Sequence, residues 1–309
     1  MTAGCAAPGP AAEWEPLGLS WHPSGQSSLS GPLLALAGRL DRAFLLLAAT
    51  LWGAREERHP ASMPAGTLQR VDYLHSFPHQ ASFPVRLDPD EANLDAFRAG
   101  PVLGPDGDVR LTRLAPAREV LTPAACYHLY AGHEGTSLAG PLYLTTSNTC
   151  FRHEARYEPL RRQWSFTMRE FVCMGSAPET EAFLAEGRSA VDLLLKRLDV
   201  AVEWSVATDP FFRPLQNPQY LMQRVQPSKH EAVYGGELAI GSANQHHDHF
   251  GAGFSITRDG GPASSACIAF GIERWLFALV RRHGTDPAAW PDPAGVAAQV
   301  TGVPAGEPA

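Results

Sequence analysis

The chain has 309 residues, enough to bury a full core in one large domain or two small ones. Its formal charge of -7 and its pI near 5.9 argue against nucleic acid as the main partner. The pairs Arg161-Arg162 and Arg281-Arg282 are too few to bind a polyanion unaided.

The N-terminal part divides into two segments by composition. Residues 1–30 are rich in Ala, Gly, Pro and Ser and lack periodicity, which predicts a flexible segment without the features of a signal peptide. Residues 31–70 are predicted as a helical extension, with one helix over residues 33–57. The most hydrophobic run, residues 43–52, is about half the length that spans a bilayer, so we expect no membrane attachment.

Residues 71–284 carry the predicted catalytic domain. Residues 71–84 suggest strand and loop, and residues 88–99 a short capped helix. Short aromatic or β-branched segments bounded by Gly, Pro, Asn or Asp then predict antiparallel strands at 127–135, 140–158, 162–175, 199–207, 230–241 and 265–270. Helices are expected at 177–198 and from residue 272 onward, and a flexible tail at 285–309. This layout predicts the α+β class, with an antiparallel sheet flanked by helices.

The cysteines indicate the compartment. There are five, at positions 5, 126, 150, 173 and 267, with wide gaps and no CxxC pair. An odd number at such spacing favours a reducing environment, so we expect a cytoplasmic protein.

A charged hairpin is the first candidate site. Arg152 and Glu154 stand two positions apart, so on a strand both side chains point into the same space. The loop and the returning strand add Arg161, Arg162, Trp164 and Phe166. Guanidinium groups beside an aromatic slot suit the phosphates and base of a nucleotide. A solvated hairpin with surface salt bridges is an equally weighted alternative.

The second candidate is the sequence Gly271-Ile-Glu-Arg274, where a buried strand turns into a helix. Arg274 stands within an otherwise apolar helix, where an unpaired charge would be costly, so it requires an anion. An acid such as Glu273 at the start of a helix is common, because it interacts well with the helix dipole.

Taken alone, the remaining polar residues leave alternatives open. Taken without any resemblance, Cys126 and Cys267 are more readily interpreted as buried cysteines that only pack in the core than as metal ligands. The histidines at 230, 246, 247 and 249 alternate faces of an extended segment and do not predict a metal site. Asp209 suits either a substrate amine or a turn cap before Pro210.

Together the two candidate segments resemble motifs 2 and 3 of class II aminoacyl-tRNA synthetases: Phe-Arg-x-Glu, a loop and a returning strand, then Gly-x-Glu-Arg entering a helix. The resemblance is greatest to the zinc-dependent seryl-tRNA synthetases of methanogens and to their truncated relatives, the amino acid:[carrier protein] ligases, and runs from about residue 73 to 282. It implies Zn²⁺ on Cys126, Glu170 and Cys267. Three protein ligands leave one position open for a substrate α-amine, which suits small amino acids.

The resemblance also assigns roles in ATP chemistry. It implies that Arg152 neutralises the α-phosphate and Arg274 the γ-phosphate, that Mg²⁺ lies near Glu237, and that Glu154 positions the nucleotide or the amine. Trp164, Phe166 and Arg169 compete for the adenine ring. The further pocket candidates are Asp209, Lys229, Ser242 and Asn244.

The acyl acceptor then decides the function. The segment before the core shows one ordinary helix and no basic surface, so we expect transfer of glycine or alanine to the phosphopantetheine thiol of a carrier protein rather than to tRNA. A tRNA-acylating enzyme and a non-catalytic sensor of amino acid or ATP are the alternatives. A homodimer is expected, with motif 1 placed at residues 118–123.

Overall fold

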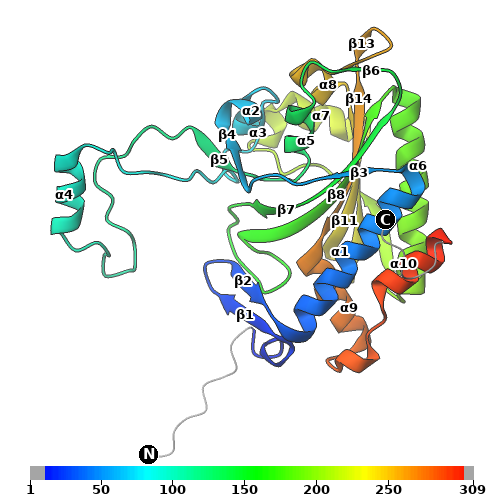
Figure 1. The fold of residues 1–309 in the computed structure, drawn as a ribbon, viewed down its shortest axis with the longest axis horizontal. Helices are drawn as coiled ribbons and strands as arrows, with labels where there is room; N and C mark the ends of the chain where they lie inside the picture. Colours follow the sequence, from blue (N-terminus) through cyan, green and yellow to red (C-terminus); the bar gives the residue numbers. More distant parts are fainter. Residues whose placement is uncertain (1–10, 303–309) are drawn as a thin grey trace, which may run out of the picture.

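The computed structural model describes residues 11–302, so the flexibility predicted for residues 1–10 and 303–309 lies outside the described residues. Its centre is a seven-stranded sheet with the order β3-β7-β8-β14-β11-β10-β9 (Figure 1). The strands are β3 (Arg55–Glu57), β7 (Leu142–Phe151), β8 (Ser165–Gly175), β14 (Ser264–Gly271), β11 (Leu238–His247), β10 (Lys229–Tyr234) and β9 (Val202–Val206). All neighbouring pairs are antiparallel except β3 with β7. The predicted α+β class with an antiparallel sheet is confirmed.

One face of the sheet is covered by the larger helices. These are α1 (Gly31–Trp52), α6 (Ala177–Arg197), α9 (Ile272–His283) and α10 (Pro293–Thr301). Phe44 of α1 stacks on Phe270 of β14 with ring centres 4.1 Å apart. Side chains alternate along β8, so Phe171 joins this helical core while Val172 joins the core on the opposite face.

Short elements border the opposite face, where the candidate site lies. The helices are α2 (Ala65–Gln69), α3 (Tyr73–Ser76), α5 (Tyr127–Gly132), α7 (Pro218–Val225) and α8 (His249–Phe254). Two small sheets pair β4 (Ser62–Pro64) with β5 (Glu119–Leu121), and join β6 (Ser137–Leu138), β12 (Thr257–Arg258) and β13 (Gly261–Pro262). Helix α4 (Glu91–Ala99) lies on an arm that extends away from the body (Figure 1).

The long helix predicted over residues 33–57 ends earlier in the structure. Helix α1 stops at Gly53, whose φ of 60° gives the left-handed C-terminal cap that glycine adopts readily. The next residues form β3, which pairs with β7. Residues 31–70 therefore do not form a separate extension, because they supply both a layer of helix and an edge strand to the central sheet.

Local capping explains the two helices that the sequence predicted well. Asp90 accepts a hydrogen bond from the Asn93 N–H at the start of α4, and Ser176 with Glu179 forms a capping box at the start of α6. The strand predicted at residues 127–135 is wrong, since this segment forms α5 and buries Leu129 and neighbouring residues on one helical face. Residues 71–84 also contain no strand, and α3 lies there instead.

Both predicted flexible ends are ordered where the structure describes them. Residues 15–29 form a short 3-10 helix, η1 (Glu15–Leu17), and a hairpin of β1 (Leu19–His22) and β2 (Gln26–Leu29). Trp14 and Leu17 are buried in the core. Beyond residue 285, η3 (Pro287–Ala289) leads to α10, which packs on α1. A few large apolar side chains anchor these segments despite their Pro- and Gly-rich composition, so the expectation of flexibility was wrong for residues 11–30 and 285–302.

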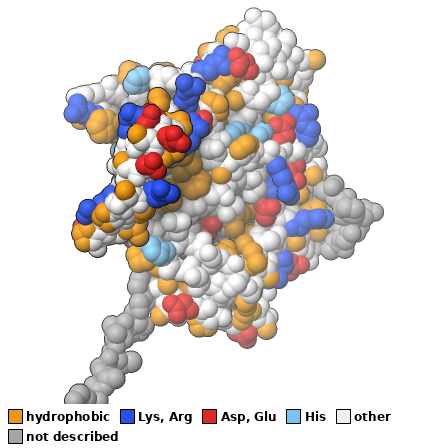
Figure 2. Space-filling view, turned by 60° about the vertical axis from the view of Figure 1, so that its left-hand side comes forward, with side chains coloured by type: hydrophobic (Ala, Val, Ile, Leu, Met, Phe, Trp, Pro, Cys, Tyr) orange, Lys and Arg blue, Asp and Glu red, His pale blue; other side chains and the backbone are white. Residues whose placement is uncertain are grey.

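Two observations concern the membrane and the surface charge. Of the helices in residues 11–302, none combines the length and the apolar character needed to cross a membrane. On the face shown in Figure 2, acidic and basic side chains lie interspersed over the body and the arm.

Candidate active site

A cavity of about 670 Å³ lies on the face of the sheet opposite α1 and α6. It is bordered by β8, β10, β11 and β14 and by residues of α5, α7 and α8. The predicted site residues that line it are Cys126, Arg152, Glu154, Arg161, Arg162, Phe166, Glu170, Asp209, Lys229, Ser242, Asn244, Cys267 and Arg274. Segments more than a hundred residues apart in sequence thus meet in one space.

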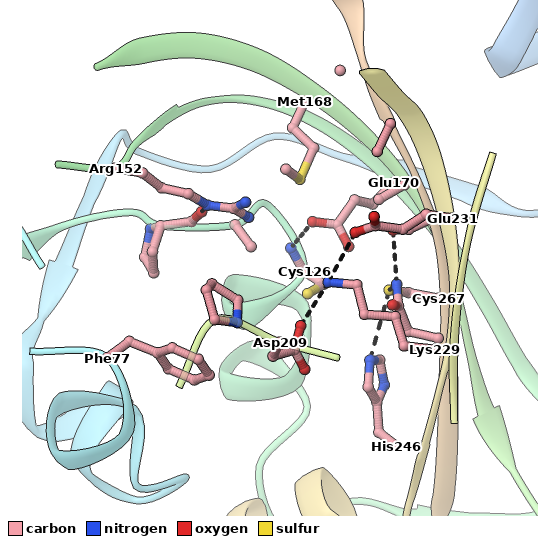
Figure 3. Close-up of a pocket in the computed structure, with 18 of the residues that line it drawn as sticks. Phe77, Cys126, Arg152, Met168, Glu170, Asp209, Lys229, Glu231, His246 and Cys267 are labelled. Atoms are coloured by element: carbon pink, nitrogen blue, oxygen red, sulfur yellow. Dashed lines mark hydrogen bonds and ion pairs between the residues drawn. The ribbon is translucent and has the colours of Figure 1, made fainter. Parts of the chain in front are cut away.

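The Cys/Glu/Cys cluster lies at the inner wall of this cavity (Figure 3). Cys126 directly precedes α5, while Glu170 and Cys267 project from the adjacent strands β8 and β14. Their ligand atoms all lie within 4.8 Å of one another, and all three residues are buried. The Cys126 backbone N–H donates to Glu170 Oε1 at 3.1 Å, which orients the carboxylate.

The chemistry of the cluster fits zinc. A hydrogen bond with Cys267, together with burial, raises the pKa of Cys126 well above its usual value, so without a cation the thiol stays protonated. A bound dication would reverse that balance and stabilise the thiolate. Two sulfurs and one carboxylate suit Zn²⁺, and three protein ligands leave one coordination position for a substrate.

Four arginine side chains also line the cavity, those of Arg152, Arg161, Arg162 and Arg274. Arg274 donates to the Arg161 and Ala239 carbonyl oxygens, each at 2.8 Å. Arg152 donates to the Pro123 carbonyl at 2.9 Å and lies 5.4 Å from the centre of the Phe166 ring. Within residues 11–302, the cavity arginines that pair with carboxylates are Arg161 and Arg162, and neither Arg152 nor Arg274 forms a salt bridge.

The electrostatics of these arginines favour an anion. Burial, followed by repulsion from Arg152 and Arg162, lowers the pKa of Arg274 to about 10. Arg162 is partly neutralised by Glu154, whose carboxylate oxygen lies 2.7 Å from its Nη1. A polyanionic ligand would relieve the remaining repulsion between the guanidinium groups.

Opposite the arginines, an ion pair faces the Cys/Glu/Cys cluster. Lys229 Nζ lies 2.6 Å from Asp209 Oδ1, and Gln223 of α7 donates to Asp209 Oδ2 at 2.8 Å. Burial acts to raise the pKa of Asp209, but Lys229 and Gln223 outweigh it and hold that pKa below its usual value. Asp209 is therefore an ionised group in the cavity. On the neighbouring strand β11, the Asn244 side-chain amide donates to Ser242 Oγ at 3.0 Å.

Three predicted residues lie outside the cavity lining. Trp164 donates through its indole N–H to Ser82 at 3.1 Å. Glu237 lies in the exposed turn before β11 and pairs with Arg161. Arg169 projects from the opposite face of β8, where it is 1% exposed and binds Asp41 and Glu56. Of the three candidates for the adenine ring, only Phe166 lines the cavity.

The cavity also contains residues that we did not predict. Glu231 lines it two positions after Lys229, and His246 two positions after Asn244. Strand alternation could have found both, since residues two apart share a face. Met168 and Tyr127 line it as well; Tyr127 was missed because its segment was predicted as a strand.

Solved structures define the class of the fold. The chain superposes on seryl-tRNA synthetase of Methanopyrus kandleri, solved in complex with A. aeolicus tRNASec, with a TM-score of 0.75 at 22% identity, covering 94% of this chain and 60% of that one. Seryl-tRNA synthetase of Pyrococcus horikoshii complexed with ATP gives a TM-score of 0.63 at 15% identity over 95% and 62% of the two chains. The fold is that of a class II aminoacyl-tRNA synthetase catalytic domain.

Sequence relatives define the family. No protein-family model matches the chain. Amino acid–[acyl-carrier-protein] ligase 1 of Bradyrhizobium diazoefficiens is 33% identical over 77% of this chain and 74% of its own, and ligase 2 of that organism is 35% identical over 76% and 71%. The type-2 serine–tRNA ligase of Methanopyrus kandleri is 27% identical over 87% of this chain and 55% of its own. This chain belongs to the family of amino acid–[acyl-carrier-protein] ligases.

Proposed function

We propose that this ligase activates glycine or alanine with ATP and transfers the aminoacyl group to the phosphopantetheine thiol of a carrier protein. One observation carries the proposal: a single cavity joins two half-buried arginines, Arg152 and Arg274, which have no carboxylate partner among the described residues, to a three-ligand Cys/Glu/Cys cluster. The first set suits the phosphates of ATP, and the second suits an amine.

In the activation step, a carboxylate oxygen of the amino acid attacks the α-phosphorus, and pyrophosphate leaves with the electrons of the broken P–O bond. Arg152 would neutralise the α-phosphate and Arg274 the γ-phosphate, while Phe166 faces the adenine ring. Such charge neutralisation and positioning suffice for this chemistry without a covalent enzyme intermediate. Glu231 lines the cavity and Glu237 does not, so Glu231 replaces Glu237 as our candidate for the Mg²⁺ that accompanies ATP.

The substrate amine would be fixed at the Cys/Glu/Cys cluster. Bound there, Zn²⁺ would supply a fourth coordination position for the neutral α-amine. Cys126, Glu170 and Cys267 would hold the metal ion, and the ionised Asp209 lies in the same cavity, where it would stabilise positive charge near the amine. The amino acid would thus be held between this cluster and the arginines.

In the transfer step, the thiolate sulfur of phosphopantetheine attacks the carbonyl carbon of the adenylate, and AMP leaves. A carrier protein is favoured over tRNA because the two relatives from Bradyrhizobium are named for that acceptor. The acidic chain also lacks the excess of positive charge that tRNA binding exploits. We further propose a cytoplasmic location, since the four described cysteines are free and buried, as in a reducing compartment. We also propose a homodimer, which the resemblance to class II synthetases implies.

Pyrophosphate exchange tests the activation step. With all twenty amino acids assayed singly, we expect ATP/pyrophosphate exchange with glycine or alanine and with few others. Exchange with none of them would contradict adenylation and favour the sensor alternative. Cys267→Ala should lose both exchange and bound zinc, while Cys173→Ala, a buried cysteine on the other face of the sheet, should retain both.

A competition between acceptors tests the transfer step. Labelled amino acid should move from the adenylate to a phosphopantetheinylated carrier protein. The same carrier without its prosthetic group is the matched control. Labelling of tRNA, with none on the carrier, would overturn the proposed acceptor while leaving the activation step in place.

A further inference from the structure

His246 lies beside the Cys/Glu/Cys cluster, and the function proposed above gives it no role. It projects from β11 into the cavity, and its Nε2 lies 3.7 Å from Cys267 Sγ (Figure 3). Asn244, two residues earlier on the same strand, donates to the same sulfur at 3.3 Å. Cys267 therefore faces two nitrogen-bearing side chains from one strand.

The other ring nitrogen of His246 faces two hydroxyl groups. Nδ1 lies 3.3 Å from the Tyr130 hydroxyl and 3.4 Å from Ser265 Oγ, and both of those residues are buried. The buried Tyr130 phenol can donate a hydrogen bond to Nδ1, which then acts as the acceptor. With Nδ1 accepting, the neutral ring carries its proton on Nε2, which points at Cys267.

Aromatic packing holds the ring in this place. The His246 ring meets Phe250 edge-on at 4.8 Å, and Phe250 is itself stacked on Tyr130 at 4.0 Å. Tyr130 of α5, Phe250 of α8 and Ser265 of β14 thus surround the imidazole. The orientation of the ring is set by the tertiary structure.

Geometry separates this position from that of a fourth ligand. The group of residues whose ligand atoms all lie within 4.8 Å of one another contains Cys126, Glu170 and Cys267 but not His246. The imidazole contacts the cluster through Nε2, which lies 3.7 Å from Cys267 Sγ. An N–H donor to a ligating thiolate orients the sulfur and withdraws charge from it, as hydrogen bonds to ligands do around metal centres generally.

We propose that His246 is a positioning residue whose Nε2–H, together with the Asn244 amide, donates to the Cys267 thiolate and so strengthens and tunes the metal site. The inference rests on the metal site of the proposed function. It predicts that the charge of two thiolates and one carboxylate is offset at Cys267, which leaves the metal a stronger acceptor for the substrate amine.

Metal titrations of the full chain test the proposal. We expect His246→Phe to bind Co²⁺ and Zn²⁺ about 10- to 100-fold more weakly, measured by competition with a chromophoric chelator. Its sulfur-to-cobalt charge-transfer absorption should also shift, which a mere packing defect would not cause. His246→Gln, which keeps an N–H donor, should recover most of the affinity. His247→Asn is the matched control: it changes the adjacent exposed histidine, whose φ of 52° asparagine tolerates.

Each outcome separates the inference from the proposed metal site. If His246→Phe matches the wild type in affinity and absorption, the inference is overturned and the metal site stands. If the wild type binds no Co²⁺, or Cys267→Ser binds it equally well, the metal site itself fails.

Two measurements on the zinc-loaded wild type do not depend on any variant folding. Long-range ¹H–¹⁵N correlation should show His246 as the Nε2–H tautomer. The Nδ1–H tautomer, or imidazole scattering in the zinc X-ray absorption spectrum, would overturn the positioning role.

Discussion

The N-terminal hairpin supports the arginine-bearing loop, and Gly25 is the residue through which this support can be tested. Gly25 ends a three-residue turn between β1 and β2, with φ of +87°. Its carbonyl oxygen accepts from the Trp164 N–H at 2.8 Å, and the Trp164 carbonyl accepts from the Arg152 N–H at 3.0 Å. The hairpin is therefore connected by two backbone hydrogen bonds to a proposed phosphate ligand.

Gly25→Ala should break this connection. The added Cβ would lie 2.7 Å from ring carbons of Tyr157 and 2.8 Å from the Trp164 nitrogen, closer than real Cβ atoms approach. The left-handed backbone adds about 1–2 kcal/mol of strain, and loss of the hydrogen bond about 1 kcal/mol. Because about 1.4 kcal/mol corresponds to a tenfold change, we expect the KM for ATP to rise by about 10- to 100-fold.

The assay is pyrophosphate exchange at varied ATP and at varied amino acid. The KM for the amino acid should change little, since the hairpin contacts the loop and not the Cys/Glu/Cys cluster. Gly107→Ala is the matched control, because Gly107 has φ of +82° but no atom within 4 Å of its added Cβ. It should incur the backbone strain alone and leave the KM for ATP unchanged. An unchanged KM for ATP in Gly25→Ala, with the protein folded, would refute this reasoning.

Three further predictions concern stability and the adenine site. Burial raises the pKa of Glu273 from 4.5 to about 7, so the folded state binds the carboxyl proton more tightly than the unfolded state does. The free energy of unfolding should therefore fall by on the order of 3 kcal/mol as the pH rises from about 4.5 through 7. Glu273→Gln should flatten that decline in urea titrations at several pH values; parallel curves for variant and wild type would contradict it. Asp41→Ala should lower the free energy of unfolding by about 2–3 kcal/mol, because it removes an acid from the buried Arg169 guanidinium. Arg169→Met should lower it less, since Asp41 and Glu56, the two acids left without a partner, reach water. Equal losses in chemical denaturation would count against this asymmetry. Phe166→Ala should raise the KM for ATP by about tenfold through lost stacking, whereas Trp164→Phe should leave this KM nearly unchanged. A larger rise in Trp164→Phe than in Phe166→Ala would mean that Phe166 does not stack on adenine.

The sequence predicted the parts of the site that depend on local pattern. Arg152 and Glu154 were predicted to point into the same space, and both line the cavity, although β7 ends at Phe151 and the two residues lie in the loop that follows rather than on the strand. The apolar strand and helix around Gly271 became β14 and α9, with Arg274 turned into the cavity. This strand and helix follow from short-range periodicity, which a single sequence records directly.

Other features could not be read from local pattern. Residues 127–135 alternate like a strand but form α5, because the buried face of that segment packs against Phe250 of α8. Residues 11–30 resemble a flexible segment by composition, yet Trp14 anchors them in the core. In both places long-range packing overrides local preference.

The sequence by itself determined the α+β class, the main strands and helices of the sheet, and the residue types of the cavity. Only the tertiary structure decided that Arg169 faces Asp41 rather than the cavity, that Glu231 rather than Glu237 lines it, and that His246 meets Cys267. The physical reason is that periodicity fixes which residues share a face of one strand, whereas strand order and register fix what that face meets.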